Sequence, residues 1–145
     1  MKIDKVKSIV RRNLKNYSSY ETIIDDLIKS KEKGTKKDVN SFIKSKNSIS
    51  RSTEIQAIRN VNIDNKILEI KEWKKIIDFV LEESKSEYEY KGKAMTYKYV
   101  NNISNDMIVD ILNVSPSGLK NWVNEFILEV GIIAIERKII KVERL

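Results

Sequence analysis

Helix-breaking residues are rare in this chain, and their rarity constrains its fold more than any other feature. One proline and four glycines interrupt 145 residues, and the glycines at positions 34, 92, 118 and 131 lie far apart. Elsewhere, apolar residues recur at intervals of three and four, the spacing that places side chains on one face of an α-helix. The sequence therefore predicts an all-α fold.

Three regions are expected along the chain. Residues 1–33 carry a helical apolar stripe and are interpreted as an N-terminal helical arm that ends at Gly34. Residues 34–52 (GTKKDVNSFIKSKNSISRS) are interpreted as a basic, Ser/Asn/Lys-rich linker, because segments that bury little apolar surface are mobile or fold on a partner. Residues 53–145 are expected to form one helical domain with a long central helix.

Apolar stripes predict where the helices lie within these regions. In the arm, the stripe consists of Ile3, Val6, Val10, Leu14 and Tyr17. Ser18 and Glu21 have the spacing of a capping box, so the helix either continues through this point or restarts at Tyr20. The central helix is expected from about Asp64 to Ser84, and its inner face would contain Ile67, Ile70, Trp73, Ile77, Val80 and Leu81.

Two segments leave alternatives open. Four tyrosines flank the sequence KGKAM within residues 86–100, which allows a hairpin. We favour instead a short helix over residues 94–101 that packs Tyr97 and Val100 inward. The tail over residues 131–145 is strongly apolar, and the sequence is compatible with a helix, a hairpin wing or a dimerising element there.

The composition excludes several kinds of functional site. Without histidine and cysteine, the chain lacks the commonest general base, the usual zinc ligands and any thiol nucleophile. The scattered glycines form neither a P-loop nor a dinucleotide-binding fingerprint. We therefore expect no catalytic residue, no metal site and no cofactor, and we expect that the protein is not an enzyme.

The hydropathy pattern indicates an intracellular protein. No apolar run approaches the about 18–20 residues that are needed to cross a bilayer, so we expect no membrane partner. The first segment, MKIDKVKSIVRRNLKN, alternates charged and apolar residues and lacks the apolar core of a secretory signal.

Residues 104–128 have the pattern of a helix-turn-helix. Ser104 is expected to cap a first helix, whose inner face would contain Met107, Ile108, Ile111 and Leu112. Asn113 lies where a tight turn requires left-handed backbone. Ser115 would cap a second helix with Pro116 in its first position, where a missing N–H costs nothing. The buried stripe of that helix would contain Leu119, Trp122, Val123 and Phe126.

The second helix would present short polar side chains outward, as DNA-reading helices do. The candidates for base contacts are Ser117, Lys120, Asn121 and Asn124, and an asparagine such as Asn121 can pair bidentately with adenine. Ser115, at the helix N-terminus, is a candidate for a phosphate contact. Gly118 costs about 1 kcal/mol relative to alanine inside a helix, so it either permits a close approach to DNA or reflects drift. A helical hairpin that only packs has a similar pattern.

The positive charge is concentrated toward the N-terminus. The chain carries a net charge of +7; residues 1–51 contain 14 basic and 6 acidic side chains, whereas residues 101–145 contain 5 and 6. Because Lys outnumbers Arg 22 to 6, AT-rich codon usage is an equally good explanation of the sum. Phosphate contacts supply most non-specific affinity for DNA. Further candidates for such contacts are therefore the basic residues Arg11, Arg12, Lys36, Lys37, Lys44, Lys46 and Arg51.

Taken in order, these segments resemble the small phage late-gene transcription regulators of the ArpU/RinA type, whose C-terminal part is similar to region 4 of sigma factors. The resemblance rests on RNLKNYSSYETIIDDL, on DNKILEIKEWKKIIDFVLEE, on TYKYV and on ILNVSPSGLKNWVN, which is similar to the helix-turn-helix of sigma-like factors. It covers most of the chain. It implies a phage or prophage protein that acts at a late promoter in the cytoplasm of a bacterial host cell.

Three functions follow as hypotheses. The first is a transcription regulator that binds double-stranded DNA sequence-specifically, as a homodimer. The second is a sigma-like factor associated with RNA polymerase, which would be contacted by the acidic residues Asp106, Asp110, Glu125 and Glu129. The third is a DNA-packaging protein similar to a small terminase subunit, which is disfavoured because the helix-turn-helix comes late in the chain.

Overall fold

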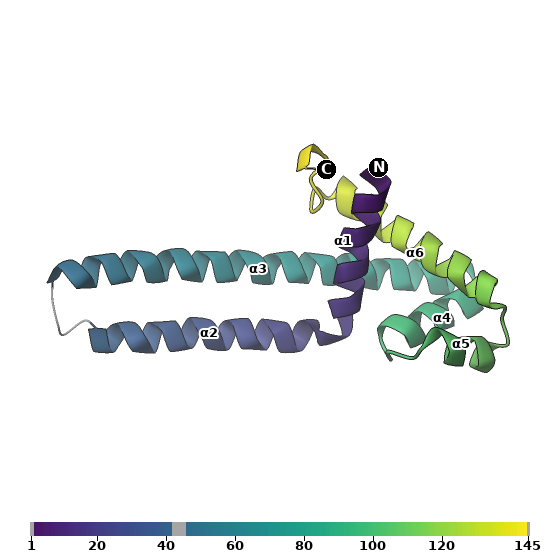
Figure 1. Cartoon of the computed structure of the whole chain (residues 1–145), viewed down its shortest axis with the longest axis horizontal. Coiled ribbons are helices and arrows are strands. Elements are labelled where there is room, and N and C mark those ends of the chain that lie inside the picture. The colour runs from purple at the N-terminus through teal and green to yellow at the C-terminus, as the bar shows by residue number, and fades with distance from the viewer. Residues whose placement is uncertain (1, 42–45, 145) are drawn as a thin grey trace. The chain divides into compact units, whose positions relative to one another are not determined.

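All regular elements in the described part of the chain are helices, which confirms the all-α prediction (Figure 1). The structure is a computed structural model that describes the backbone of residues 2–41 and 46–144 and the side chains of residues 2–31 and 53–143. In order, the elements are α1 (Lys2–Asn16), the 3-10 turn η1 (Tyr17–Ser19), α2 (Tyr20–Ser41), α3 (Lys46–Glu87), α4 (Glu89–Tyr99), α5 (Asn105–Leu112), α6 (Pro116–Glu136) and the 3-10 turn η2 (Val142–Arg144).

The helices divide into two compact units. The first consists of Met1–Ser19 and Glu72–Leu145, and the second consists of Tyr20–Lys71, so the boundary falls inside α3. The first unit therefore contains α1, α4, α5, α6 and the C-terminal part of α3. This division differs from the one expected from the sequence, which separated an arm over 1–33 and a linker over 34–52 from the rest of the chain.

The predicted arm is split because α1 packs with the C-terminal helices. Of the stripe predicted on α1, Val6, Val10 and Leu14 are buried in the first unit, whereas Ile3, near the open end of the helix, is 61% exposed and Tyr17 is half-buried. α1 ends at Asn16 and α2 begins at Tyr20, which confirms the alternative of a helix that restarts at Tyr20. The apolar stripe of α1 thus belongs to a core formed with residues of α6, more than a hundred positions away. The sequence predicts the stripe, but it does not predict this partner.

Helix also extends into the predicted linker. α2 continues past Gly34 to Ser41, and α3 begins at Lys46, far ahead of the predicted start near Asp64. Lysine is a good helix former, and a single glycine costs only about 1 kcal/mol. A segment that is poor in apolar residues therefore still extends the helices on either side of residues 42–45, which lie outside the described part of the chain.

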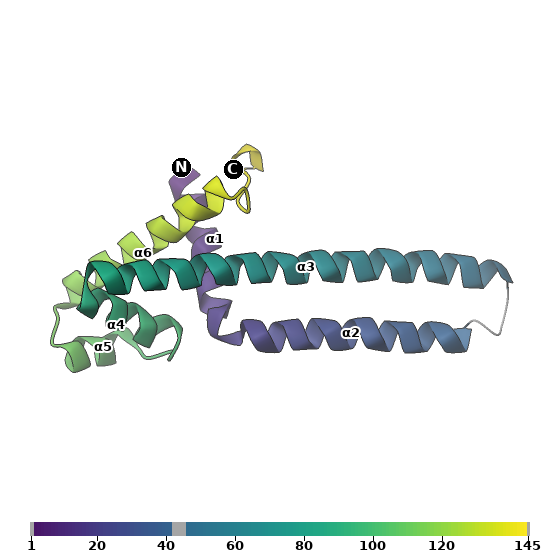
Figure 2. The same ribbon diagram turned by 180° about the vertical axis from the view of Figure 1, so that it is seen from behind.

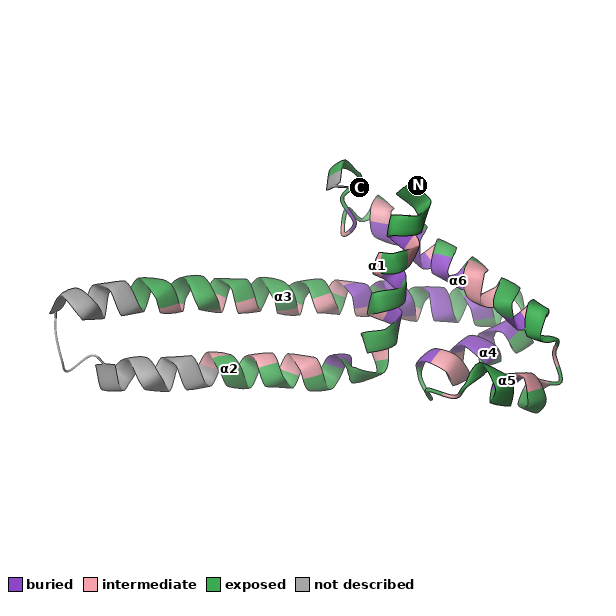
Figure 3. Cartoon of the chain, in the orientation of Figure 1, coloured by how far each residue is buried: buried purple, intermediate pink, exposed green. Residues whose placement is uncertain are grey.

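The core of the first unit is centred on α6. Helices α1, α4 and α5 all pack against α6, and α5 also packs against α4. Figure 3 shows the buried stripe along α6 and the buried part of α3. The buried apolar side chains are Val6, Val10 and Leu14 of α1, Trp73, Ile76, Ile77, Val80 and Leu81 of α3, Ala94, Met95 and Tyr99 of α4, Ile108 of α5, and Leu119, Phe126, Ile127, Val130 and Ala134 of α6, with Ile140 beyond it.

The second unit is a helical hairpin. α2 and the N-terminal part of α3 lie side by side and antiparallel in both views (Figures 1 and 2). On α3, the half-buried side chains Ile63, Ile67 and Ile70 lie on one face. Next to Ile63 on α3, the Asp64 Oδ1 lies 3.1 Å from the Nζ of Lys31 on α2. This ion pair joins the two helices.

Both segments that the sequence left open contain α-helix. Residues 89–99 form α4, so the hairpin alternative is excluded there; the residue packed inward at its end is Tyr99, while Val100, predicted to be buried, is 42% exposed. The tail continues α6 to Glu136 and then reverses at Lys138, which has a φ of 61°. The Ile140 N–H donates to the Ala134 carbonyl, and this bond folds the tail back onto α6.

Close approach of α1 to α6 depends on Gly131. A Cβ atom at this position would lie 2.8 Å from the Val6 Cγ1, which is inside van der Waals contact. Valine is β-branched and has a stiff side chain, so it has little freedom to move away. The absence of a side chain at Gly131 therefore lets the two helices meet at the level of Val6.

We expect Gly131→Ala to lower the free energy of unfolding by about 1–2 kcal/mol, because overpacking outweighs the gain in helix propensity. In a Val6→Ala background the collision is removed, so the same substitution should be neutral or stabilising. Urea unfolding followed by circular dichroism measures all four variants. An equal effect of Gly131→Ala in both backgrounds would contradict the assigned contact.

Candidate nucleic-acid interface

The predicted helix-turn-helix is formed by α5 and α6, and its local geometry follows from the residues named at its caps. The Ser104 Oγ accepts from the Met107 N–H at 3.4 Å at the start of α5. Asn113 has φ 53° and ψ 46°, the left-handed conformation predicted for the turn. The Ser115 Oγ accepts from the Gly118 N–H at 3.0 Å, and Pro116 begins α6. These capping and turn predictions are confirmed.

Gly118 leaves room for this cap. A Cβ atom at Gly118 would lie 2.9 Å from the Ser115 Oγ, which is the atom that accepts from the Gly118 N–H. A larger residue would therefore crowd the hydroxyl that satisfies the helix N-terminus. This local role is a reason for the glycine that the sequence pattern alone did not suggest.

The inner faces of α5 and α6 are narrower than predicted. Ile108 is fully buried, but Met107 and Ile111, predicted to lie inside, are 57% and 51% exposed. A two-turn helix that packs along one side buries only a narrow stripe, and Ile108 occupies it. On α6, Leu119 and Phe126 are buried as predicted, whereas Trp122 and Val123 are half-buried.

Aromatic contacts hold α6 against α4. The ring of Tyr99 stacks on Phe126, with ring centroids 5.4 Å apart. Trp122 meets Tyr88, the residue that precedes α4, in an edge-to-face contact at 5.6 Å. Burial raises the pKa of Tyr99 to about 12, an effect that the charge of Arg11 opposes, so the phenol is neutral near pH 7. The side of α6 that carries Phe126 is therefore fixed toward α4.

The side chains predicted to contact bases lie on the first three turns of α6. Ser117, Lys120 and Asn121 are exposed, and Asn124 is half-buried. Ser115 is exposed, and its hydroxyl is engaged in the cap and lies 3.4 Å from the Ser117 Oγ. The helix thus presents a polar surface opposite the apolar side that packs against the rest of the unit.

The structure describes the side chains of only two of the seven basic residues outside the motif that are predicted to contact phosphate. Arg11 and Arg12 are both exposed on α1. The side chains of Lys36, Lys37, Lys44, Lys46 and Arg51 lie outside the described residues. Among the described candidates, Arg11 is the one that lies in a pocket beside α6.

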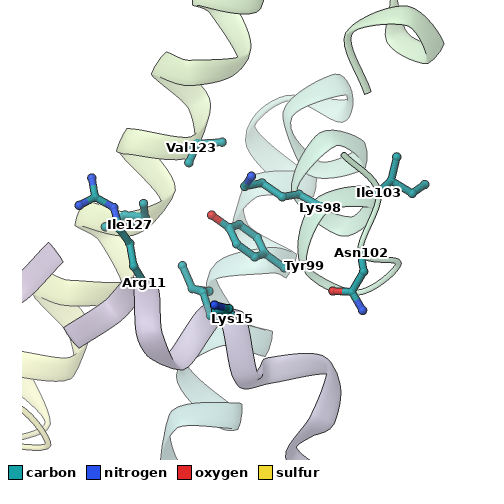
Figure 4. Close-up of a pocket in the computed structure, with 9 residues that line it drawn as sticks. Arg11, Lys15, Lys98, Tyr99, Asn102, Ile103, Val123 and Ile127 are labelled. Atoms are coloured by element: carbon teal, nitrogen blue, oxygen red, sulfur yellow. The ribbon is translucent and has the colours of Figure 1, made fainter. Parts of the chain in front are cut away.

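This pocket is the basic feature of the first unit that sequence analysis did not find. It has a volume of about 420 Å³ and lies between α1, the end of α4 and α6 (Figure 4). Its cationic side chains are Arg11, Lys15 and Lys98. The rest of its lining consists of Leu14, Tyr99, Asn102, Ile103, Val123 and Ile127, without an acidic residue. Lys15 and Lys98 are separated by most of the chain, so no local motif relates them.

Lys98 and Asn102 are held in place by neighbouring side chains. The Lys98 Nζ donates to the Asn105 Oδ1 at 2.7 Å and lies 5.6 Å from the centre of the Tyr99 ring. Burial lowers the pKa of Lys98. Asn102 has a φ of 55°, and its Nδ2 donates to the Ser18 Oγ at 3.0 Å, which joins the α4–α5 turn to η1.

A buried lysine links α4 to α6 on another part of the unit. Lys91 is 4% exposed, and its Nζ lies 3.1 Å from Glu125, 3.5 Å from Glu129 and 3.8 Å from Glu87. Burial alone would lower the pKa of Lys91, but the hydrogen bond to Glu125 and the charges of Glu129 and Glu125 outweigh it and raise the pKa. Glu125 and Glu129, assigned by the sequence to a polymerase-binding face, thus have a partner within the unit.

Replacing Lys91 by methionine is expected to lower the free energy of unfolding by about 1–3 kcal/mol. Breaking a fully buried ion pair costs more than this. The cost is smaller here because the three carboxylates that remain are partly exposed to water. The matched control is Lys93→Met, which removes a single exposed pair with Glu89 and should change stability by about 0.5 kcal/mol or less. Urea unfolding compares them, and equal losses would contradict the special role of Lys91.

The destabilisation by Lys91→Met should also depend on pH. A raised folded-state pKa contributes stability that is present below the ordinary value of 10.5 and is lost as the pH rises through the folded-state value. The difference between the wild type and Lys91→Met should therefore be constant from neutral pH up to that value and shrink above it, as urea unfolding at a series of pH values would show.

Comparison with family models, with curated proteins and with solved structures gives no match for this chain. The described residues contain no group of three acidic side chains arranged to hold a metal ion. No helix among those described is long and apolar enough to cross a membrane.

Proposed function

We propose that this protein is a sequence-specific regulator of transcription that binds double-stranded DNA through α5 and α6. The observation that carries the proposal is the division of α6 into two sides. Leu119 and Phe126 are buried, whereas Ser117, Lys120 and Asn121 are exposed on the first turns. This arrangement presents polar side chains on a rigid helix, and the major groove of B-DNA, about 12 Å wide, admits such a helix.

The exposed residues supply complementary kinds of contact. The Asn121 carboxamide is able to donate to and accept from the edge of an adenine, which distinguishes adenine from the other bases. Lys120 supplies a positive charge for a phosphate, a contact that adds affinity on every sequence. Ser115 and Ser117 bring hydroxyls to the N-terminus of α6, where backbone N–H groups and the helix dipole also favour an anion.

The resemblance to phage late-gene regulators supports the biological setting of this activity. An N-terminal helix, a long central helix and a final helix-turn-helix occur in the order that the resemblance implies. The proposal is therefore that the protein acts at a promoter, as phage and prophage regulators do. It assigns the chain a binding role and no enzymatic step.

Selection from a random duplex library, followed by sequencing, tests the proposal. We expect the wild type to enrich one short site, and Asn121→Ala to retain DNA binding while losing preference at one position, because the bidentate contact is removed. Lys120→Ala should weaken binding to all sequences alike and reduce the salt slope by about 1.

The control for this experiment is Lys75→Ala, which removes an exposed lysine on α3 outside the helix-turn-helix. It should leave the enriched site and the affinity unchanged. Enrichment of the same site with the same preference by Asn121→Ala would refute the assignment of α6 as the reading helix.

We also propose that the protein binds DNA as a homodimer, with α3 of the second unit as the contact surface. On the side of α3 away from Ile63 and Ile67, the side chains of Ile58, Val61 and Leu68 are 63%, 56% and 60% exposed. With Asn65 they follow the three–four–three spacing of a coiled-coil seam. One asparagine within such a seam fixes register and partner number at a cost in stability, which favours a second copy of α3 as the occupant.

Val61→Glu should convert the dimer to a monomer, because it places a charge inside the seam. Lys66→Glu introduces the same side chain outside the seam of the same helix and should leave the dimer intact. Sedimentation equilibrium over a range of protein concentrations measures both. A wild type that is monomeric throughout, or a Val61→Glu variant that associates like the wild type, would contradict the proposed seam.

A further inference from the structure

The pocket beside α6 is lined by three cationic side chains and by no acidic one. Lys74, Lys75, Lys85, Lys91 and Lys93 each have a carboxylate partner. The three pocket cations have none among the described residues. Arg11 and Lys15 are moreover one helical turn apart on α1, where like charges destabilise a helix. An anion bound in the pocket would relieve the repulsion between these like charges.

The lining favours an anion that is attached to an apolar group. Arg11, Lys15 and Lys98 supply positive charge, and the neutral Tyr99 hydroxyl and the Asn102 amide add hydrogen-bond donors. Leu14, Val123 and Ile127 form an apolar wall beside them. A phosphodiester with its deoxyribose has both properties, since its oxygens accept hydrogen bonds and its sugar carbons pack against aliphatic side chains. The volume of about 420 Å³ is ample for one such unit.

The pocket also lies next to the surface that would read bases. Val123 follows Lys120 by three residues and Ile127 follows it by seven, so Lys120 lies at the border between the polar surface of α6 and the side that lines the pocket. At 1.5 Å per residue, the distance along the helix from Lys120 to Ile127 is about 10 Å. A helix seated in the major groove is flanked by the sugar-phosphate backbones, so a strand passing α6 would reach the pocket.

We propose that the pocket formed by Arg11, Lys15, Lys98 and Tyr99 binds one phosphodiester group of the DNA backbone and thereby fixes the duplex against α6. This inference rests on the proposed DNA-binding function. It names a positively charged contact with DNA, which the C-terminal third of the chain by itself lacks. From the sequence, Arg11 and Arg12 are equal candidates for a phosphate contact. The pocket assigns this contact to Arg11, because Arg12 does not line it.

The test measures affinity for the enriched site and for random duplex DNA by fluorescence anisotropy over a range of salt concentrations. Arg11→Gln and Lys98→Gln should each weaken binding to both duplexes roughly tenfold, the scale of one charge-assisted hydrogen bond, and reduce the salt slope by about 1. Arg12→Gln, the matched control on the same helix, should change both quantities less. Arg11→Gln should not lower the melting temperature, since it relieves repulsion within the pocket.

The outcomes separate this inference from the proposed function. If DNA binding and the Asn121→Ala effect occur but Arg11→Gln behaves like Arg12→Gln, the pocket assignment is overturned and the function stands. If no variant and no wild-type protein binds DNA, both are overturned. A third arm titrates inorganic phosphate and thymidine 5′-monophosphate into the protein alone. Saturable binding of either one, combined with DNA affinity that is insensitive to Arg11 and Lys98, would identify a small-anion site instead.

Discussion

The arrangement of this protein depends on the apolar side of α6. Leu119, Phe126, Ile127 and Val130 are buried along it, and burying side chains of this size contributes roughly 1.5–3 kcal/mol each. α1, α4 and α5 all pack on this helix. Because that side of α6 is occupied, the orientation of the helix is fixed, and its polar first turns face outward. The candidate interface is thus a consequence of core packing.

Basic side chains occur in two contrasting environments in the first unit. At Lys91 the unit buries one cation and surrounds it with three carboxylates, so the charges are compensated internally and α4 is joined to α6. In the pocket near Arg11, cations are gathered and left without carboxylates among the described residues. The first arrangement stabilises the fold, and the second is suited to an external anion.

Local signals in the sequence predicted the parts of the structure that depend on neighbouring residues. Ser104, Asn113 and Ser115 act on backbone groups within a few positions, so the caps, the turn and the exposed side of α6 followed from their identities. The all-α class followed from the helical spacing of apolar residues. The hypothesis of DNA binding came from the same segment and rests on the same side chains.

Features that depend on distant residues were not predictable in this way. Lys91 and Glu125 are 34 positions apart, and nothing near Lys91 marks it as buried. The pocket needs α1 beside the end of α4, and these two segments are more than 80 residues apart in the sequence. Met107 and Ile111 have the spacing of a buried face, yet the core reaches only Ile108. α2 and α3 extend beyond the range that apolar spacing predicts, because lysine favours helix even where little apolar surface is buried.

Mapping amide chemical shifts of the nitrogen-15-labelled protein during titration with a short DNA duplex tests the central claim most directly. The account predicts that the largest changes occur at the start of α6, from Ser115 to Asn124, and at Arg11 and Lys98 around the pocket. Changes confined to α2 and the N-terminal part of α3, with α6 unaffected, would contradict it and assign the contact with DNA to the second unit.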